Sequence, residues 1–346
     1  MKKWLLALGS HVKIKKMAFK DVPGNSRVKK ILIRALQKNR VPNSLLFCGP
    51  EGVGKRETAL VLAKALNCQR RSDDACETCA SCKAVNAGNF PDVMEIQPEK
   101  NVLKIEQMRL LRDVAYFKPM TGKKRIFIVA EAEKMTDEAA NSLLKILEEP
   151  PLFSYIILMT HNPFLLMSTI KSRCQVLNFL PISKEDMEKI LMGKGYERGK
   201  ARVLSLIVRG NLKQAFGLEW EEVQARRKQA WQLFLSLLTK ENVAHFLRNY
   251  TTSQRSLIKE EWAELLEILS SFCRDLILVK ENSRERLLMN PDYEEEMRKV
   301  EKLVSQEDLM DFLSRIDYTL YGLQKNFNLS LLVSSVFFNF KDWEYV

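Results

Sequence analysis

Short apolar runs alternate with amphipathic stretches in the first half of the chain. Residues 26–40 space their apolar side chains as a helix does, and SLLFCGP (44–50) is an apolar run that ends at a Gly-Pro break. Similar runs lie at 91–98, 126–129 and 155–160. Apolar runs of about four to eight residues bounded by turn residues are typical of buried strands. The pattern predicts a parallel α/β layer with helices on both faces of the sheet.

Further helices are expected between these strands. A helix is expected over 104–115. Thr136 or Asp137 is expected to cap another helix, which Pro150–Pro151 ends. Residues 168–179 predict a short helix followed by a strand.

The pattern changes after Pro181 and is helical almost to the end of the chain. Three long amphipathic stretches lie at 223–239, 257–280 and 294–315. We therefore expect an α/β domain at 1–180, a small helical lid domain at 181–220 and an all-helical domain at 221–346.

The composition is that of a globular chain with a basic balance. Of 346 residues, 46% are hydrophobic and 28% are charged, which excludes a disordered chain. The net charge of +12 favours an anionic partner such as nucleic acid. The basic residues are scattered, so a merely soluble basic protein remains the alternative.

The N-terminal residues do not predict export or a membrane anchor. No apolar run approaches the roughly 18 residues that span a bilayer. The apolar stretch Trp4–Leu8 is shorter than the about 7–15 residues of a signal peptide, and lysines follow it. We expect a cytoplasmic protein without membrane contact, in which residues 1–16 are an extension or a mis-assigned start.

A glycine-rich segment follows the first predicted strand. Gly49, Gly52, Gly54 and Lys55 fit the phosphate-loop pattern G-x-x-x-x-G-K, between a strand and a helix. In such loops, backbone N–H groups cradle phosphates and the lysine reaches the terminal ones. The alternative is an ordinary glycine-rich turn.

The residues that would hold Mg²⁺ are altered. Arg56 stands where the loop requires Ser or Thr, and Thr58 lies about 200° further around the helix. After the strand IFIV, Ala130 replaces the expected aspartate, whereas Glu131 stands where a water-positioning glutamate belongs. Glu131 is equally well explained as a solvated loop residue. Mg²⁺-dependent hydrolysis is expected to be absent or feeble, and ATP binding remains open.

Four of the seven cysteines are clustered at 68–82, between a predicted helix and a predicted strand. They are Cys68, Cys76, Cys79 and Cys82. Four thiolates, two pairs of them in C-x₂-C spacing, are typical of a closed tetrahedral Zn²⁺ site. We expect a structural zinc knuckle; the alternative is four reduced, unliganded thiols.

Taken together, these motifs resemble the bacterial clamp-loader subunits of DNA polymerase III, the delta-prime and gamma/tau family of AAA+-type proteins. The resemblance is carried by NRVPNSLLFCGPEGVGK (39–55), the cysteine spacing, EKMTDEAANSLLKILEEPP (133–151) and Ser172-Arg173-Cys174. It covers about the first 220 residues, and the remainder only by its helical character.

The resemblance implies roles for two further residues. Arg173 corresponds to the family's arginine finger, which reaches the ATP site of a neighbouring subunit; otherwise it is a surface ion-pair residue. A guanidinium there stabilises charge on the transferring phosphate. Lys213 falls where active members carry a nucleotide-sensing arginine, and it keeps the charge without the planar fork.

The resemblance therefore implies a delta-prime-like stator that donates Arg173 but hydrolyses ATP poorly itself. Its expected partners are gamma/tau and delta subunits in a pentameric ring, joined by a collar at 221–346, together with the sliding clamp and primed DNA. One rival hypothesis is a gamma/tau-like ATP-hydrolysing motor subunit. Another is a zinc-dependent nucleic-acid-binding module on an AAA+ scaffold, although no aromatic stacking platform is interleaved with the cysteines.

Overall fold

The computed structural model divides the chain into two compact units. The residues it describes are 16–71, 73–208, 210–217, 219–239, 259–281, 288–324, 332 and 336. The α/β unit comprises Met1–Ala201 with Val208–Phe216, and the helical unit comprises Arg202–Ile207 with Gly217–Val346. Most of the N-terminal extension expected at 1–16 lies outside the described residues. The expected three-domain division stays a prediction.

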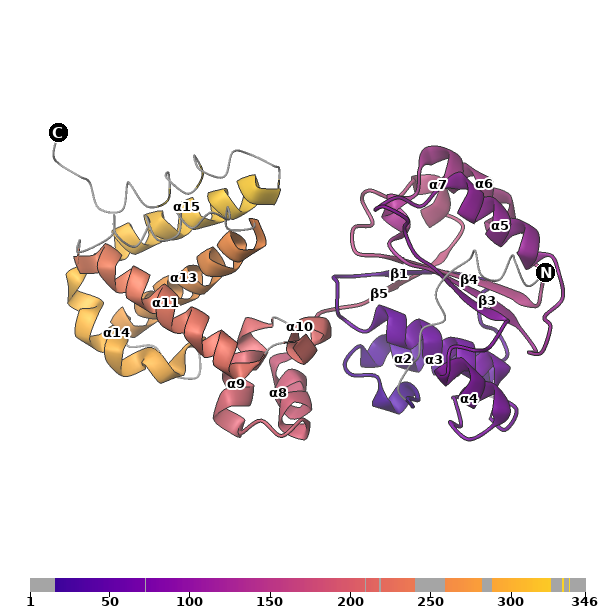
Figure 1. Cartoon of the computed structure of the whole chain (residues 1–346), viewed down its shortest axis with the longest axis horizontal. Helices are drawn as coiled ribbons and strands as arrows, with labels where there is room; N and C mark the ends of the chain where they lie inside the picture. Colours follow the sequence, from indigo (N-terminus) through magenta and orange to yellow (C-terminus); the bar gives the residue numbers. More distant parts are fainter. Residues whose placement is uncertain are drawn as a thin grey trace. The chain divides into compact units, whose positions relative to one another are not determined.

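One parallel sheet of five strands, in the order β2-β3-β4-β1-β5, forms the centre of the α/β unit (Figure 1). The strands are β1 (Ser44–Cys48), β2 (Val93–Ile96), β3 (Arg125–Val129), β4 (Ser154–Thr160) and β5 (Gln175–Asn178). The two central pairings are parallel and in continuous register, with Leu46 opposite Leu158 and Phe127 opposite Ile156. The predicted parallel α/β architecture is confirmed.

Helices cover both faces of this sheet, as Figure 1 shows. They are α2 (Ser26–Gln37), α3 (Lys55–Asn67) and α4 (Ala80–Asn86) on one side, and α5 (Ile105–Ala115), α6 (Asp137–Glu148) and α7 (Ser168–Lys171) on the other. Successive residues of a strand point to opposite faces. Accordingly, Leu45 and Phe47 pack with the first set, and Leu46 packs with the second.

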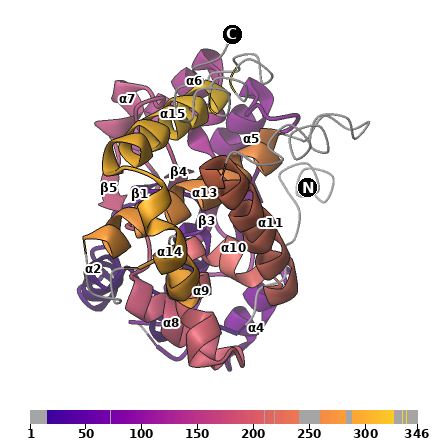
Figure 2. The ribbon, with the colours of Figure 1, turned by 90° about the vertical axis from the view of Figure 1, so that its left-hand side faces the viewer.

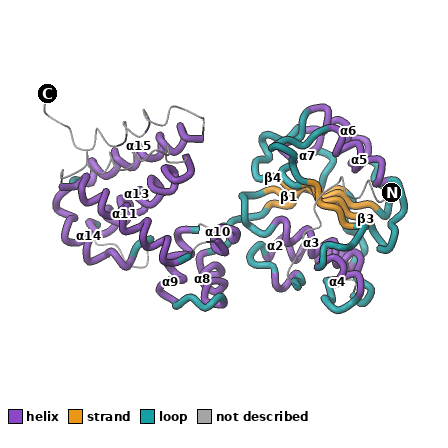
Figure 3. Tube along the Cα trace, viewed as in Figure 1, coloured by secondary structure: helices purple, strands orange, loops and turns teal. Residues whose placement is uncertain are grey.

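The remaining chain is helical and contributes no strand among its described residues (Figure 3). Its helices are α8 (Lys184–Gly193), α9 (Arg198–Ile207), α10 (Leu212–Gly217), α11 (Trp220–Thr239), α13 (Lys259–Lys280), α14 (Glu294–Val300) and α15 (Gln306–Gln324). Short 3₁₀ turns lie at Phe19–Asp21, Ala132–Lys134, Pro291–Tyr293 and Glu301–Leu303.

Helix α13 lies between α11 and α15 in the helical unit, where the three share one apolar core (Figure 2). Trp231, Phe234, Phe272 and Phe312 are buried in this core. Across the described parts of the chain, none of the helices is both long enough and apolar enough to cross a membrane.

Two predicted boundaries can be compared with the structure. Thr136 is the N-cap of α6, and its hydroxyl accepts a hydrogen bond from the Ala139 N–H. The amphipathic stretch 294–315 is not one helix, because the chain is extended at Val304. The Ser305 N–H donates to the Asp308 carboxylate and the Asp308 N–H donates to the Ser305 hydroxyl, so a new helix, α15, begins here. This capping box competes with helix continuation, which a periodic apolar pattern does not reveal.

Candidate functional site

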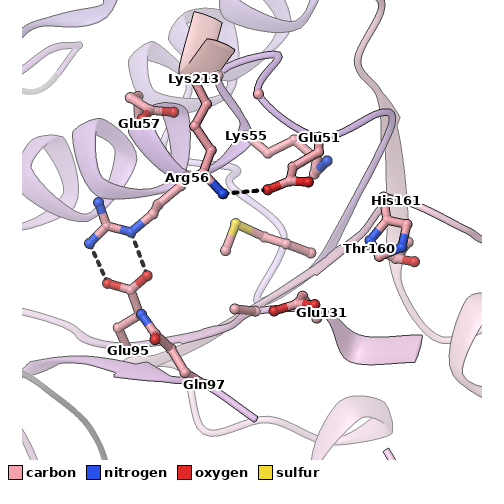
Figure 4. Close-up of a pocket in the computed structure, with 14 residues that line it drawn as sticks. Glu51, Lys55, Arg56, Glu57, Glu95, Gln97, Glu131, Thr160, His161 and Lys213 are labelled. Carbon is pink, nitrogen blue, oxygen red and sulfur yellow. Dashed lines mark hydrogen bonds and ion pairs between the residues drawn. The ribbon is translucent and has the colours of Figure 1, made fainter. Parts of the chain in front are cut away.

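A cavity of about 400 Å³ opens at the carboxyl edge of the sheet, beside the phosphate-loop segment (Figure 4). Of the residues predicted to bind nucleotide, Gly52, Gly54, Lys55, Glu131 and Lys213 line it. Ligands of open α/β sheets bind at this edge, outside the carboxyl ends of the strands. The position of the cavity is therefore that of a nucleotide site.

The loop conformation depends on its glycines. Gly52 and Gly54 have φ angles of 72° and 90°, a region that favours glycine. A Cβ at Gly52 would lie 1.8 Å from the Asn211 Oδ1 atom. Gly49 does not line the cavity; a Cβ there would lie 2.3 Å from the Phe179 carbonyl oxygen. The loop thus needs Gly52 and Gly54 for their backbone conformation, and Gly49 and Gly52 because a side chain would clash with neighbouring atoms.

Lys55 is the first residue of helix α3, and its ammonium donates hydrogen bonds to carbonyl groups of the phosphate loop. Nζ donates to the Pro50 carbonyl at 2.6 Å and also to the Gly49 carbonyl. Burial lowers the pKa of Lys55, an effect that the carboxylates of Glu133 and Glu51 oppose without a direct bond. An anion in the cavity would supply the missing countercharge.

Arg56, in the position of the metal-binding hydroxyl, forms a two-pronged ion pair. Its Nε and Nη2 atoms donate to the Glu95 carboxylate at 2.5 and 2.6 Å (Figure 4). The Glu95 side chain is only 6% exposed. Planar two-point contacts of this kind are the strongest that arginine makes with a carboxylate. The pair joins the first turn of α3 to strand β2.

The donor set does not fit a magnesium ion. Thr58 is fully buried, and its hydroxyl donates to the Gly54 carbonyl at 2.7 Å. Ala130 has no oxygen ligand to offer, and the Glu131 carboxylate pairs with Lys134. Mg²⁺ requires oxygen ligands in octahedral geometry. The same cavity does fit phosphate, because the glycine loop and Lys55 are intact.

Lys213 approaches the cavity from helix α10. Its Nζ atom lies 2.8 Å from Glu51 Oε1, and the pair is exposed (Figure 4). This hydrogen bond lowers the pKa of Glu51 and raises the pKa of Lys213. One residue earlier, the Leu212 N–H donates to the Gly52 carbonyl at 2.7 Å. The start of α10 is therefore hydrogen-bonded to the phosphate loop.

Arg173 lies outside this cavity. Its Nε donates to Glu148 at 2.5 Å and its Nη1 to the Thr169 carbonyl at 2.9 Å. The Arg173 side chain remains 30% exposed. The guanidinium is thus held at the end of α6 and next to α7, away from the chain's own phosphate loop.

Several pocket residues escaped prediction from the sequence, among them Glu95, Thr160 and His161. Glu95 is the next-to-last residue of strand β2, Thr160 is the last residue of β4, and His161 follows it. His161 Nδ1 lies 2.5 Å from the buried Glu133 carboxylate, whose other oxygen has no described partner. The sequence signal that could have identified Glu95, Thr160 and His161 was their position at the carboxyl ends of predicted strands. Polar residues at the ends of parallel strands meet at the same edge of the sheet.

The four clustered cysteines converge as their spacing predicted. The sulfur atoms of Cys68, Cys76, Cys79 and Cys82 all lie within 4.8 Å of one another, and Cys76 and Cys82 are 4.0 Å apart. Zn–S bonds of about 2.3 Å in a tetrahedron separate the sulfurs by about 3.8 Å.

Backbone N–H groups orient this cluster. The N–H of Cys79 donates to the Cys76 sulfur and that of Cys82 to the Cys79 sulfur, at 3.3 and 3.5 Å. Slight burial opposes ionisation of Cys76, but hydrogen bonds from Thr78 and Cys79 lower the pKa of its thiol to about 6. Four convergent thiol groups fit a closed, structural tetrahedral metal site.

The parallel sheet and the phosphate loop at its carboxyl edge define an AAA+-type P-loop protein. A family model described as DNA polymerase III, delta subunit, matches residues 24–183. The delta′ subunit of DNA polymerase III from Bacillus subtilis is 30% identical over 273 residues, which are 76% of this chain and 80% of that protein. The chain belongs to the family of DNA polymerase III clamp-loader subunits.

Relatives named as tau subunits are matched over a smaller part of their own length. The Bacillus subtilis tau subunit is 30% identical over 76% of this chain, but the match spans only 50% of tau. The Escherichia coli tau subunit is 32% identical over 58% of this chain and 32% of its own length. Among solved structures, a gamma subunit-related protein of Thermotoga maritima is 19% identical, with a TM-score of 0.45 over 89% of this chain and 97% of that one.

Proposed function

We propose that this chain is the delta-prime subunit of a bacterial clamp loader, a cytoplasmic stator that does not hydrolyse ATP effectively. The observation that carries the proposal is the Arg56–Glu95 ion pair, which occupies the place of the metal-binding hydroxyl. Ala130 and Lys213 are two further departures from an active site. Loss of Mg²⁺ removes the charge neutralisation on which phosphoryl transfer depends.

Arg173 is proposed to act on a neighbouring subunit. Its partly exposed guanidinium lies away from the chain's own loop, which suits action in trans. Glu148 and the Thr169 carbonyl orient the arginine, so little side-chain entropy is lost when it meets a phosphate. The partner site would belong to a gamma/tau motor subunit.

The ring we propose contains gamma/tau and delta subunits beside this chain. It would open the sliding clamp and load it on primed DNA. The helical unit would supply the collar, and the proposed zinc ion would hold the cysteine module in place. DNA contact by a chain of net charge +12 would be made with phosphates and would weaken as salt rises.

A second candidate is a gamma/tau-like motor, favoured by the 30% identity to the tau subunit over 76% of the chain. The two candidates differ in one measurable property. A motor needs Mg²⁺ at its own phosphate loop, whereas a stator needs only its arginine.

Steady-state ATP hydrolysis separates them. We would measure the chain alone, then with primed DNA and clamp, and finally with gamma/tau and delta. The expected result is no turnover by the chain alone and turnover in the full mixture. Robust Mg²⁺-dependent turnover by the chain alone would overturn the stator and favour the motor.

Arg173→Ala in the full mixture tests the arginine finger. Turnover at the ATP site that receives Arg173 should fall by about 10³-fold or more. The total turnover of the mixture should therefore fall by the fraction that this one site contributes. Arg173→Lys should rescue little, because an ammonium lacks the planar fork. Arg34→Ala, at an exposed position on α2, is the control and should assemble and turn over normally. Equal turnover in the Arg173 and Arg34 variants would contradict the finger.

A further inference from the structure

The charges around the cavity are mostly paired internally. Arg56 is paired with Glu95, Lys213 with Glu51, and Glu131 with Lys134. Lys55 differs, since the hydrogen bonds that the described structure gives its ammonium go to carbonyl oxygens only. Among the described residues, the Lys55 ammonium therefore gives the cavity a half-buried positive charge without a directly bonded carboxylate, at the start of a helix.

That charge lies where a phosphate would meet several donors. Gly54 caps α3, a helix of 13 residues whose first N–H groups face the loop. Free N–H groups and the helix dipole at such an end favour an anion. The glycine cradle and the cavity of about 400 Å³ leave room for one.

The usual companion of the phosphate, a divalent cation, has been replaced. Arg56 carries a permanent positive charge at the position of the metal-binding hydroxyl, and Glu95 fixes its orientation by accepting two hydrogen bonds from it. A second cation there would be repelled by the guanidinium and would find no oxygen ligand at residue 130. The Nη1 group of Arg56 has no hydrogen-bond acceptor among the described residues and remains available to an anion.

We propose that this pocket binds the phosphates of a nucleoside di- or triphosphate without Mg²⁺, with the Arg56 guanidinium in place of the metal ion. The proposal deepens the non-hydrolysing role proposed above and rests on it. Bound nucleotide would act as a structural ligand of the stator: it would neutralise Lys55 and stabilise the loop, with no metal to support its hydrolysis.

Metal-free nucleotide should then bind at least as tightly as its Mg²⁺ complex. Complexation by Mg²⁺ removes two of the negative charges that Lys55 and Arg56 would attract, so the metal should leave binding unchanged or weaken it. In an intact phosphate loop, Mg²⁺ adds bonds to both nucleotide and protein and strengthens binding. The sign of the Mg²⁺ effect therefore distinguishes the two arrangements.

The test is calorimetric titration of the full-length chain with ATP and with ADP, once in EDTA and once in excess Mg²⁺. The wild type is expected to bind at least as tightly in EDTA as in Mg²⁺. Binding that needs Mg²⁺, or no binding of either nucleotide under both conditions, would overturn the proposal.

The role of Arg56 needs a variant that does not leave Glu95 buried and unpaired. Arg56→Gln combined with Glu95→Gln keeps a neutral hydrogen-bonding pair and should weaken binding in EDTA about tenfold or more, the effect of one lost charged contact. Arg112→Ala is the matched control, because this arginine uses the same Nε and Nη2 atoms toward exposed Asp113, away from the cavity. Unchanged affinity of the double variant would refute the role of Arg56.

A converse variant restores the metal ligands. Arg56→Thr and Ala130→Asp, combined with Glu95→Gln so that no buried carboxylate is left unpaired, should convert the pocket to one whose affinity for ATP rises about tenfold on adding Mg²⁺. The same lack of Mg²⁺ response as in the wild type would count against the proposal. These titrations use the isolated chain, so their failure is distinguishable from failure of the stator, which is judged by turnover in the ring.

Discussion

Asp92 and Arg125 form a fully buried ion pair at the amino-terminal edge of the sheet. The carboxylate accepts hydrogen bonds from the N–H groups of Met120, Thr121 and Gly122 at 2.7–2.8 Å and from the Arg125 guanidinium at 3.0 Å. Burial raises the pKa of Asp92, but these hydrogen bonds outweigh it and the net shift is downward. The pair fixes the connection from α5 to β3.

Asp92→Asn should destabilise the α/β unit by about 3–5 kcal/mol at pH 7, because it leaves Arg125 buried without its countercharge. A folded-state pKa below the unfolded value of about 3.9 contributes stability above that value, which is lost as pH falls through the folded pKa. Urea denaturation at several pH values should therefore give a constant difference from the wild type above about pH 5, and a shrinking one below about pH 4.

Asp113→Asn serves as the control, since the Asp113 carboxylate is exposed and, among the described residues, pairs only with Arg112. It should cost less than about 1 kcal/mol. A difference between Asp92→Asn and wild type that stays constant down to pH 3 would show that the ionised form of Asp92 is not what stabilises the fold.

Helix α3 links the phosphate loop at its first residue to the cysteine module at its end. Lys64 is fully buried and donates to Glu77 at 2.6 Å and to Asn86 at 2.9 Å, both within or next to the module. Lys123 Nζ donates to the Cys68 carbonyl at 2.9 Å. Buried charged contacts of this kind require both partners to be held in place. A metal that fixes the module therefore also supports α3.

We expect one Zn²⁺ per chain, measured by atomic absorption on protein purified without a metal-binding tag. Cys79→Ser should lose the metal and lower the melting temperature of the α/β unit by about 5–10 °C, because an apo module no longer holds its buried contacts. Cys273→Ala removes a buried thiol far along the chain, in the core of the helical unit, and should keep the metal. Equal metal content in the two variants would rule out the cysteine cluster as the site.

The whole molecule consists of two units with separate apolar cores. Separate cores need not unfold together, so a chain of this kind departs from two-state behaviour. Three tryptophans report on this directly, since Trp220, Trp231 and Trp262 lie in the described part of the helical unit.

Calorimetry is expected to resolve two unfolding transitions. In a background that carries Trp4→Phe and Trp343→Phe, tryptophan fluorescence should follow only the transition of the helical unit. Adding Cys79→Ser should move the other transition to lower temperature and leave the fluorescence transition in place. A single transition that shifts as a whole would mean that the two units unfold cooperatively.

Local patterns were sufficient for much of the fold. The alternation of strands and helices, the N-cap at Thr136 and the convergence of four cysteines followed from residues close together in sequence. The N-cap at Thr136 requires only a hydrogen bond from the N–H three residues later. A glycine at a positive φ requires only that its own backbone adopt that conformation. Such features are encoded within a few residues and can be read without the fold.

Only the tertiary structure decided which residues pair with one another around the altered phosphate loop. The sequence by itself determined that Arg56 cannot ligate Mg²⁺, but not that Glu95 holds it. That partner lies 39 residues away. The two meet because β2 joins the sheet beside β3, and no local pattern specifies strand order. In the same way, Lys213 meets Glu51 across 162 residues. Contacts over such separations follow from how the elements pack, which only the folded chain determines.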